Sequence, residues 1–229
     1  MTTIVSTHRA SARWVPYALV VLSLVPAISG SLRLTGLAGG LSLMPVDPRI
    51  DASPLPVIVH IASVIPYSLL GAFQFSSRVR ARHPRWHRMT GRVLVPLALA
   101  VALSGLWMTL AYPAKPGSGV VLFGIRLVVG TAMATSVALG FAAIRHGDVR
   151  RHRAWMTRAY ALALGAGTQV FTGAFGPPLV GTSVLANDLT MGEAWVINLA
   201  VAEYVIHRPE SRAIRGATLP AAATKGELP

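Results

Sequence analysis

Long apolar stretches, separated by short polar segments, recur along the chain from Trp14 almost to its C-terminus. A helix needs about 20 predominantly apolar residues to cross a bilayer, and six stretches approach or reach that length: 14–30, 57–75, 93–112, 120–144, 160–175 and 191–207. The fifth stretch is the weakest, because glycines and the run Gly176-Pro177-Pro178 interrupt its outer half. The pattern predicts an all-α, polytopic membrane bundle of about six transmembrane helices within residues 14–207.

The two ends of the chain are polar. Residues 1–13 are expected to form a cytoplasmic N-terminal segment, and residues 208–229, rich in Ala, Pro and Thr, a disordered cytoplasmic tail. The first apolar stretch has an alternative interpretation as a signal peptide, because basic residues precede it and Ala27-Ile28-Ser29 resembles a cleavage site. A retained membrane anchor is the favoured interpretation.

Composition agrees with a membrane protein. Hydrophobic residues make up 53% of the 229 residues and charged residues only 13%, against about 25% charged in soluble domains. The chain has no cysteine, which excludes disulfides, thiolate metal sites, iron–sulfur clusters and a cysteine nucleophile. No Gly-rich phosphate loop, nucleophile elbow or metalloprotease motif is present.

The formal charge of +13 is distributed as a topology signal, not as a nucleic-acid-binding patch. Seventeen of the 21 lysines and arginines lie in the N-terminal segment, the segments 78–92 and 145–158, and the C-terminal tail. Basic residues are enriched in cytoplasmic loops. We therefore expect a multi-pass protein of a bacterial inner membrane, in contact with the lipid bilayer, with both termini cytoplasmic and no nucleic-acid partner.

Two basic motifs occupy matching positions. HRMTGR begins at His87 and leads into the third stretch, while HRAWMTR begins at His152 and leads into the fifth. Similar Leu-Gly segments, beginning at Leu70 and Leu139, precede the two basic loops. This similarity predicts a duplicated hairpin, with spans two and three related to spans four and five, and places the two histidines at similar depth.

His87 and His152 are the main candidates for chemistry. Two histidines on neighbouring helices can bind the iron of haem b, and arginines such as Arg92 and Arg158 can pair with its propionates. The alternative is that these residues anchor the helix ends at the membrane surface. A quinone head, a lipid headgroup or an anionic metabolite would use the same residues.

Other polar residues within apolar stretches are candidates because such residues are costly at membrane depth. His60 is interpreted as a core histidine bonded to a neighbouring helix, or else as a ligand or proton carrier. Glu203 is expected to form a salt bridge with Arg92 or Arg158, the alternative being a proton acceptor.

Three further side chains belong to this group. Arg126 is expected to extend toward the outer surface or pair with Asp188, or to hold an anionic ligand. Asn198 is expected to bond across helices, and Trp155 to lie in the inner aromatic belt or stack on a ring ligand.

The chain resembles the domain-of-unknown-function 2306 family of predicted bacterial membrane proteins. The resemblance covers about residues 55–207. It rests on His60 in VHIASV, the segment Leu70–Phe75 that closes the second stretch, the motif HRMTGR, the block HRAWMTRAYAL and the segment from Trp195 to Glu203. It implies a membrane protein but no particular activity. A fainter likeness points to di-haem cytochrome b bundles.

The sequence thus leaves three classes of function open. The first is electron transfer linked to haem or quinone at His87 and His152. The second is a carrier or binder of a small lipophilic or anionic molecule, and the third is a structural scaffold.

Overall fold

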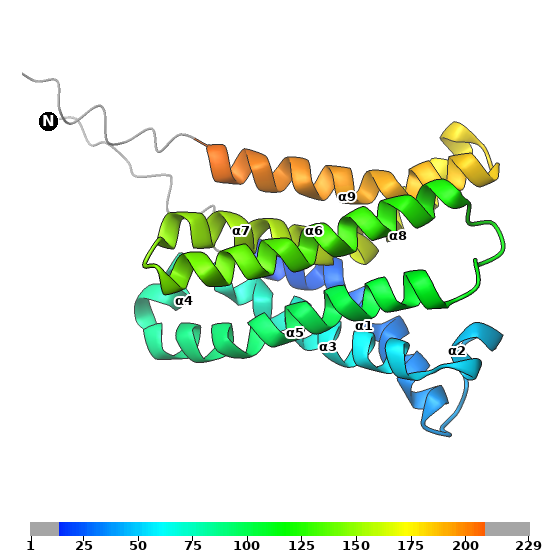
Figure 1. Ribbon diagram of the computed structural model, residues 1–229, viewed down its shortest axis with the longest axis horizontal. Helices are drawn as coiled ribbons and strands as arrows, with labels where there is room; N and C mark the ends of the chain where they lie inside the picture. Colours follow the sequence, from blue (N-terminus) through cyan, green and yellow to red (C-terminus); the bar gives the residue numbers. More distant parts are fainter. Residues whose placement is uncertain (1–13, 209–229) are drawn as a thin grey trace, which may run out of the picture.

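The computed structural model describes residues 14–208, and every regular element in that range is an α-helix (Figure 1). The predicted N-terminal segment 1–13 and, apart from Arg208, the predicted tail lie outside the described residues. The helices are α1 (Val15–Leu37), α2 (Pro48–Ala52), α3 (Leu55–Gln74), α4 (Ser77–Arg82), α5 (Pro84–Ala111), α6 (Val120–Arg145), α7 (Val149–Ala163), α8 (Gly165–Val180) and α9 (Val184–His207).

Helices α1, α3, α5, α6 and α9 are each long and apolar enough to cross a membrane. The fifth apolar stretch of the sequence is divided between α7 and α8, which are separated only by Leu164. Together these two helices run from one end of the molecule to the other (Figure 1). The prediction of a multi-pass helical membrane bundle is confirmed. Five of the six predicted stretches form single helices of membrane-spanning length, and the fifth is divided between two shorter helices.

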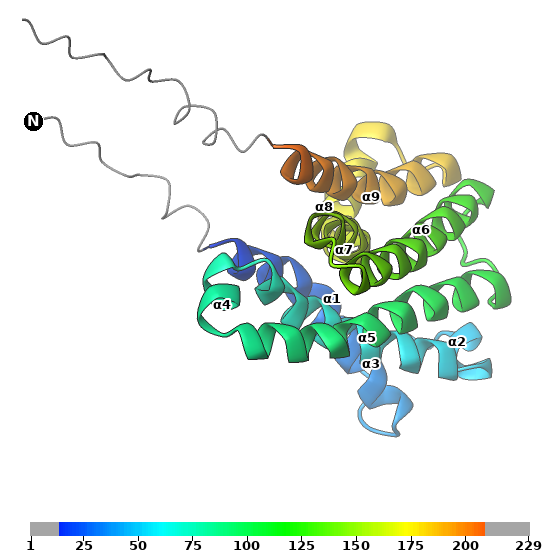
Figure 2. The same ribbon diagram turned by 60° about the vertical axis from the view of Figure 1, so that its left-hand side comes forward.

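The helices run in alternating directions along the long axis, so one end of the molecule collects the basic loops. The start of α1, helix α4, the turn between α6 and α7 and the end of α9 all lie at this end (Figures 1 and 2). Helix α3 packs on α5 and α1, α6 packs on α5 and α7, and α9 packs on α8, α7 and α6. His87 and His152 therefore lie at the same end, as their motifs predict.

The two hairpins that the repeat predicts differ in their turns. The α6–α7 turn is short: Gly147 has a φ of 76°, and the Asp148 side chain accepts a hydrogen bond from the Arg151 N–H to cap α7. The turn between α3 and α5 contains an additional helix, α4, which Ser76 caps through the Val79 N–H. The first copy of the hairpin is thus longer at its basic end.

An aromatic cluster joins the two hairpins in the core. Tyr160 of α7 lies with its ring centroid 5.8 Å from that of Tyr67 and 4.9 Å from that of Phe75. Its hydroxyl donates to the Ser68 carbonyl at 2.6 Å. A Cβ at Gly71 would lie 2.6 Å from the Tyr160 ring, so the glycine of this Leu-Gly segment is what allows α3 and α7 to approach.

Polar contacts fix the opposite end of the bundle. Asp188 of α9 is 1% exposed and accepts hydrogen bonds from the backbone N–H groups of Gly119 and Leu122, at the start of α6. In the connection between α1 and α3, Asp47 caps α2 and pairs with Arg49 at 2.7 Å. The hydrogen bond from Arg49 holds the pKa of the Asp47 carboxyl below its usual value.

The break between α7 and α8 is satisfied by side chains of α9. The last carbonyls of a helix lack partners within the helix, and here the Trp195 indole N–H donates to the Leu162 carbonyl at 3.1 Å. The Asn198 amide donates to the Ala161 carbonyl at 3.1 Å and accepts from the Thr168 hydroxyl at 2.8 Å. The predicted bond of Asn198 across helices is confirmed. Trp195 takes part in the same contact between α9 and the break.

We expect Gly165→Ala to destabilise the protein, because a Cβ there would lie 2.1 Å from the Trp195 indole nitrogen. Overpacking of this kind costs roughly 1–3 kcal/mol, so the midpoint of thermal unfolding in detergent should fall. Gly124→Ala is the matched control, since a Cβ at that helical glycine has no neighbour within 4 Å and should leave the midpoint unchanged or raise it. An equal midpoint for both variants would contradict the close contact at the break.

Candidate binding groove

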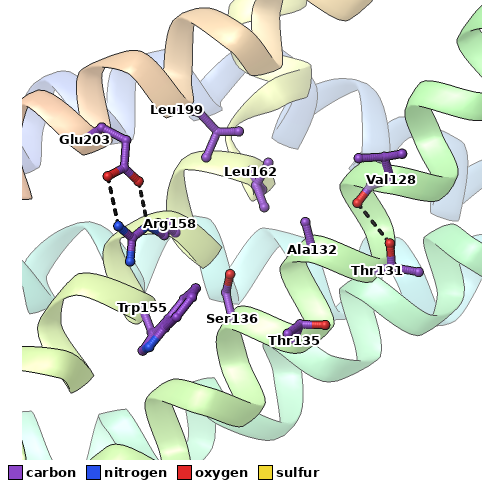
Figure 3. Close-up of a pocket in the computed structure, with 10 residues that line it drawn as sticks. All are labelled: Val128, Thr131, Ala132, Thr135, Ser136, Trp155, Arg158, Leu162, Leu199 and Glu203. Carbon is purple, nitrogen blue, oxygen red and sulfur yellow. Dashed lines mark hydrogen bonds and ion pairs between the residues drawn. The ribbon is translucent and has the colours of Figure 1, made fainter.

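A cavity of about 510 Å³ lies between α6, α7 and α9 (Figure 3). We call it the groove; its lining residues are Val128, Thr131, Ala132, Thr135, Ser136, Trp155, Arg158, Leu162, Leu199 and Glu203. Three of the candidate residues from the sequence, Trp155, Arg158 and Glu203, therefore line one cavity. Ligand cavities in proteins typically measure about 300–1,000 Å³, so the groove has room for a small molecule.

The groove is apolar over most of its length and polar at one end. Aliphatic side chains come from all three helices, with Ala132 on α6, Leu162 on α7 and Leu199 on α9. Hydroxyls come from α6 alone. The Thr131 hydroxyl is taken by its own helix, donating to the Leu127 carbonyl at 2.7 Å, whereas the Ser136 hydroxyl points into the groove (Figure 3).

The polar end is an ion pair that joins α7 to α9. The Arg158 Nε donates to one carboxylate oxygen of Glu203 at 2.5 Å, and Nη2 donates to the other at 2.8 Å (Figure 3). Trp155 lies one turn before Arg158, and the guanidinium carbon is 4.7 Å from the centroid of the Trp155 ring. The predicted salt bridge of Glu203 is confirmed with Arg158 as its partner, not Arg92.

This pair is accessible from the groove. The Arg158 side chain is 23% exposed and that of Glu203 is 40% exposed. A guanidinium carries five N–H groups, and two of them bond to Glu203. The rest are free of protein acceptors within residues 14–208. The groove therefore offers hydrogen-bond donors whose positive charge is already neutralised.

His152 is held by the helix before it. Its Nδ1 lies 2.8 Å from the Gly140 carbonyl oxygen, across the α6–α7 hairpin. A Cβ at Gly140 would meet the side chains of Met156 and Trp155, so this glycine allows α7 to pack closely enough for the bond to form. When Nδ1 is the protonated nitrogen, Nε2 keeps its lone pair for another partner.

His87 is placed differently from His152. Its Nδ1 is buried and has no hydrogen-bond partner within residues 14–208. The ring lies within electrostatic range of His152, Arg80 and Arg88. Neither His87 nor His152 lines the groove, so the structure places the two histidines at the same end of the bundle but outside the cavity.

The remaining candidates lie away from the groove. The Nδ1 of His60 is 3.0 Å from the Ser104 hydroxyl and 3.2 Å from the Val101 carbonyl, both on α5, as expected for a histidine held by a neighbouring helix. Arg92 and Arg126 are exposed, and within residues 14–208 neither forms an ion pair. Asp188, the expected partner of Arg126, bonds instead to the start of α6.

Sequence reasoning did not single out the α6 wall of the groove. Thr131 and Thr135 are four residues apart and so share a face of α6, and Ser136 follows directly. The sequence therefore shows that these hydroxyls share one face of the helix. It does not show that α9 packs against α6 and turns this face into one side of a cavity.

The model of the family of predicted membrane proteins called DUF2306 matches residues 57–206 of the chain. The chain belongs to the DUF2306 family. The match includes every residue that lines the groove, whereas α1 precedes it. No curated protein and no solved structure matches this DUF2306 protein.

Proposed function

We propose that the protein binds a lipophilic small molecule in the groove, with the apolar part of the ligand along α6 and α9 and its polar head at Arg158 and Glu203. The observation that carries this proposal is the composition of the cavity: a mostly apolar space of about 510 Å³ with one polar end. Ligand sites commonly combine apolar walls with a few convergent polar groups.

The position of the groove supports entry from the bilayer. Its walls are α6 and α9, both long and apolar enough to cross a membrane, together with α7. Val128, at the end of the groove away from Arg158, is 67% exposed, and the exposed residues of α9 include Val196 and Val201. An apolar molecule dissolved in the lipid would meet this surface without crossing water.

The ion pair also distinguishes a binding role from a purely structural one. A salt bridge that only held α7 to α9 would not require a cavity beside it. Here the pair lines one end of a cavity, and Arg158 has N–H groups without an acceptor within residues 14–208. We therefore favour a carrier or binder over a scaffold.

A second candidate function is electron transfer linked to haem or quinone at His87 and His152. It is supported by the bond of the His152 Nδ1 to the Gly140 carbonyl, which leaves Nε2 available as an axial ligand of haem iron. The buried, unpartnered Nδ1 of His87 nearby supports it too. Arg158 is already paired with Glu203, so a propionate would have Arg92 as its more available partner.

We also propose that the basic end of the bundle is cytoplasmic, in a bacterial inner membrane. The segments 78–92 and 145–158 hold 11 of the 16 lysines and arginines within residues 14–208, and they surround helix α4 and the α6–α7 turn at that end. The positive-inside rule then places the start of α1 and the end of α9 on the cytoplasmic side.

The groove is tested by photolabelling the protein in phospholipid vesicles with a diazirine-bearing dodecanoyl methyl ester. We expect labelling of α6 and α9 peptides that excess methyl laurate suppresses. Ala132→Phe should fill the groove and reduce this suppressible labelling by about tenfold or more, which corresponds to about 1.4 kcal/mol. Ala142→Phe, at an exposed position of the same helix outside the groove, should label like the wild type.

Two results would refute the groove as a binding site. One is labelling of the wild type that methyl laurate does not suppress, which would indicate contact with bulk lipid only. The other is suppressible labelling that Ala132→Phe leaves intact.

The haem hypothesis is tested by reduced-minus-oxidised spectra of protein purified from haem-supplemented cells. If His87 and His152 are axial ligands, the wild type should show a b-type difference band, and either His87→Ala or His152→Ala should abolish it. His146→Ala, an exposed histidine of the adjacent turn, serves as the control. A folded wild type without a band would exclude haem ligation under these conditions.

The orientation can be tested by single-cysteine labelling, because the natural chain has no cysteine. A membrane-impermeant maleimide applied to intact cells should label Ala114→Cys, between α5 and α6, and should label His146→Cys only after permeabilisation. The reverse result would overturn the proposed orientation.

A further inference from the structure

We infer that the groove selects an uncharged head group with a hydrogen-bond-accepting carbonyl, such as an ester, ketone or quinone, and that Glu203 is the residue that sets this selectivity. The inference rests on the proposed function and adds the chemical class of the ligand. It follows from the charges and the donors at the polar end of the groove.

The charge balance of the groove is zero. Among its lining residues only Arg158 and Glu203 carry charge, and they neutralise each other through two hydrogen bonds. A carboxylate or phosphate in the groove would add an unpaired negative charge beside Glu203, and an ammonium group would add an unpaired positive charge beside Arg158. Unpaired charge is costly in a low-dielectric site, so a neutral head is favoured over both.

The free groups at this end are mainly donors. Both carboxylate oxygens of Glu203 already accept from Arg158, whereas part of the guanidinium N–H set is unused. The guanidinium carbon lies 4.7 Å from the centroid of the Trp155 ring, a cation–π contact that helps to hold the group in place. A carbonyl oxygen can accept from these donors without displacing Glu203.

One further side chain contacts the ion pair and must be controlled. The Nδ1 of His207 lies 3.4 Å from a Glu203 carboxylate oxygen, on the same helix. A protonated His207 would add positive charge next to the pair. All competitors are therefore compared at one fixed pH, so that the charge on His207 is the same throughout.

The experiment compares three dodecyl competitors against the photoreactive ester in vesicles: methyl laurate, laurate and dodecyltrimethylammonium. For the wild type we expect methyl laurate to compete about tenfold more effectively than either charged compound, relative to its concentration in the membrane. Glu203→Gln leaves Arg158 without its counter-charge and should shift the preference at least about tenfold toward laurate.

Two further variants make the test specific. Glu193→Gln removes an exposed carboxylate from the opposite part of the same helix and should not change the preference. The double variant Arg158→Gln with Glu203→Gln returns the groove to zero charge and should restore the preference for the neutral competitor, even if Glu203→Gln alone proves too unstable to study.

The outcomes separate the two proposals. If no competitor suppresses labelling of the wild type, the proposed function fails. If suppression occurs but the wild type prefers laurate, the groove is a binding site and the inference about its ligand is overturned. The same conclusion follows if Glu203→Gln does not shift the preference toward laurate and the double variant does not restore the preference for methyl laurate.

Discussion

The structure depends on one constraint: in a bilayer, backbone groups that a helix leaves unpaired must find partners within the protein. The break at Leu164 leaves carbonyls at the end of α7, and Trp195 and Asn198 of α9 supply the donors. Gly165 allows the indole to reach them. These bonds fix both the depth and the rotation of α9. They therefore also decide where Glu203, two turns further along α9, meets α7.

The groove follows from this placement of α9. Leu199 and Glu203 lie on the same face of α9 as Trp195 and Asn198, which contact the break. This face is turned toward the side of α7 that carries Trp155, Arg158 and Leu162. Helix α9 packs closely on α8 and less on α6. The space between α6 and α9 at the basic end is consequently left as a cavity, with the ion pair at its end.

The features that could be predicted from the sequence are those that depend on local patterns of residues. Apolar length and the distribution of arginines gave the helices and the end at which the basic loops meet, and the rarity of membrane-depth carboxylates drew attention to Glu203. The sequence did not predict which arginine would pair with Glu203, because that choice depends on the packing of α9 on α7. The emphasis on His87 and His152 rested on the similarity of their motifs. Motif similarity does not show which further helix packs on each hairpin, and the cavity lies where α9 covers α7, beside Trp155 and Arg158 and not at the histidines.

The two basic motifs differ in the spacing between histidine and arginine, and this difference helps to explain why the two arginines have different surroundings. Arg92 follows His87 by five residues, whereas Arg158 follows His152 by six. One residue corresponds to about 100° around a helix, so the two arginines point to different sides relative to their histidines. In addition α9 packs on α7 and not extensively on α5. Arg92 thus remains exposed, while Arg158, turned toward Glu203, lines the groove. The two hairpin ends have similar motifs, and the packing of the last helix makes only one of them part of a cavity.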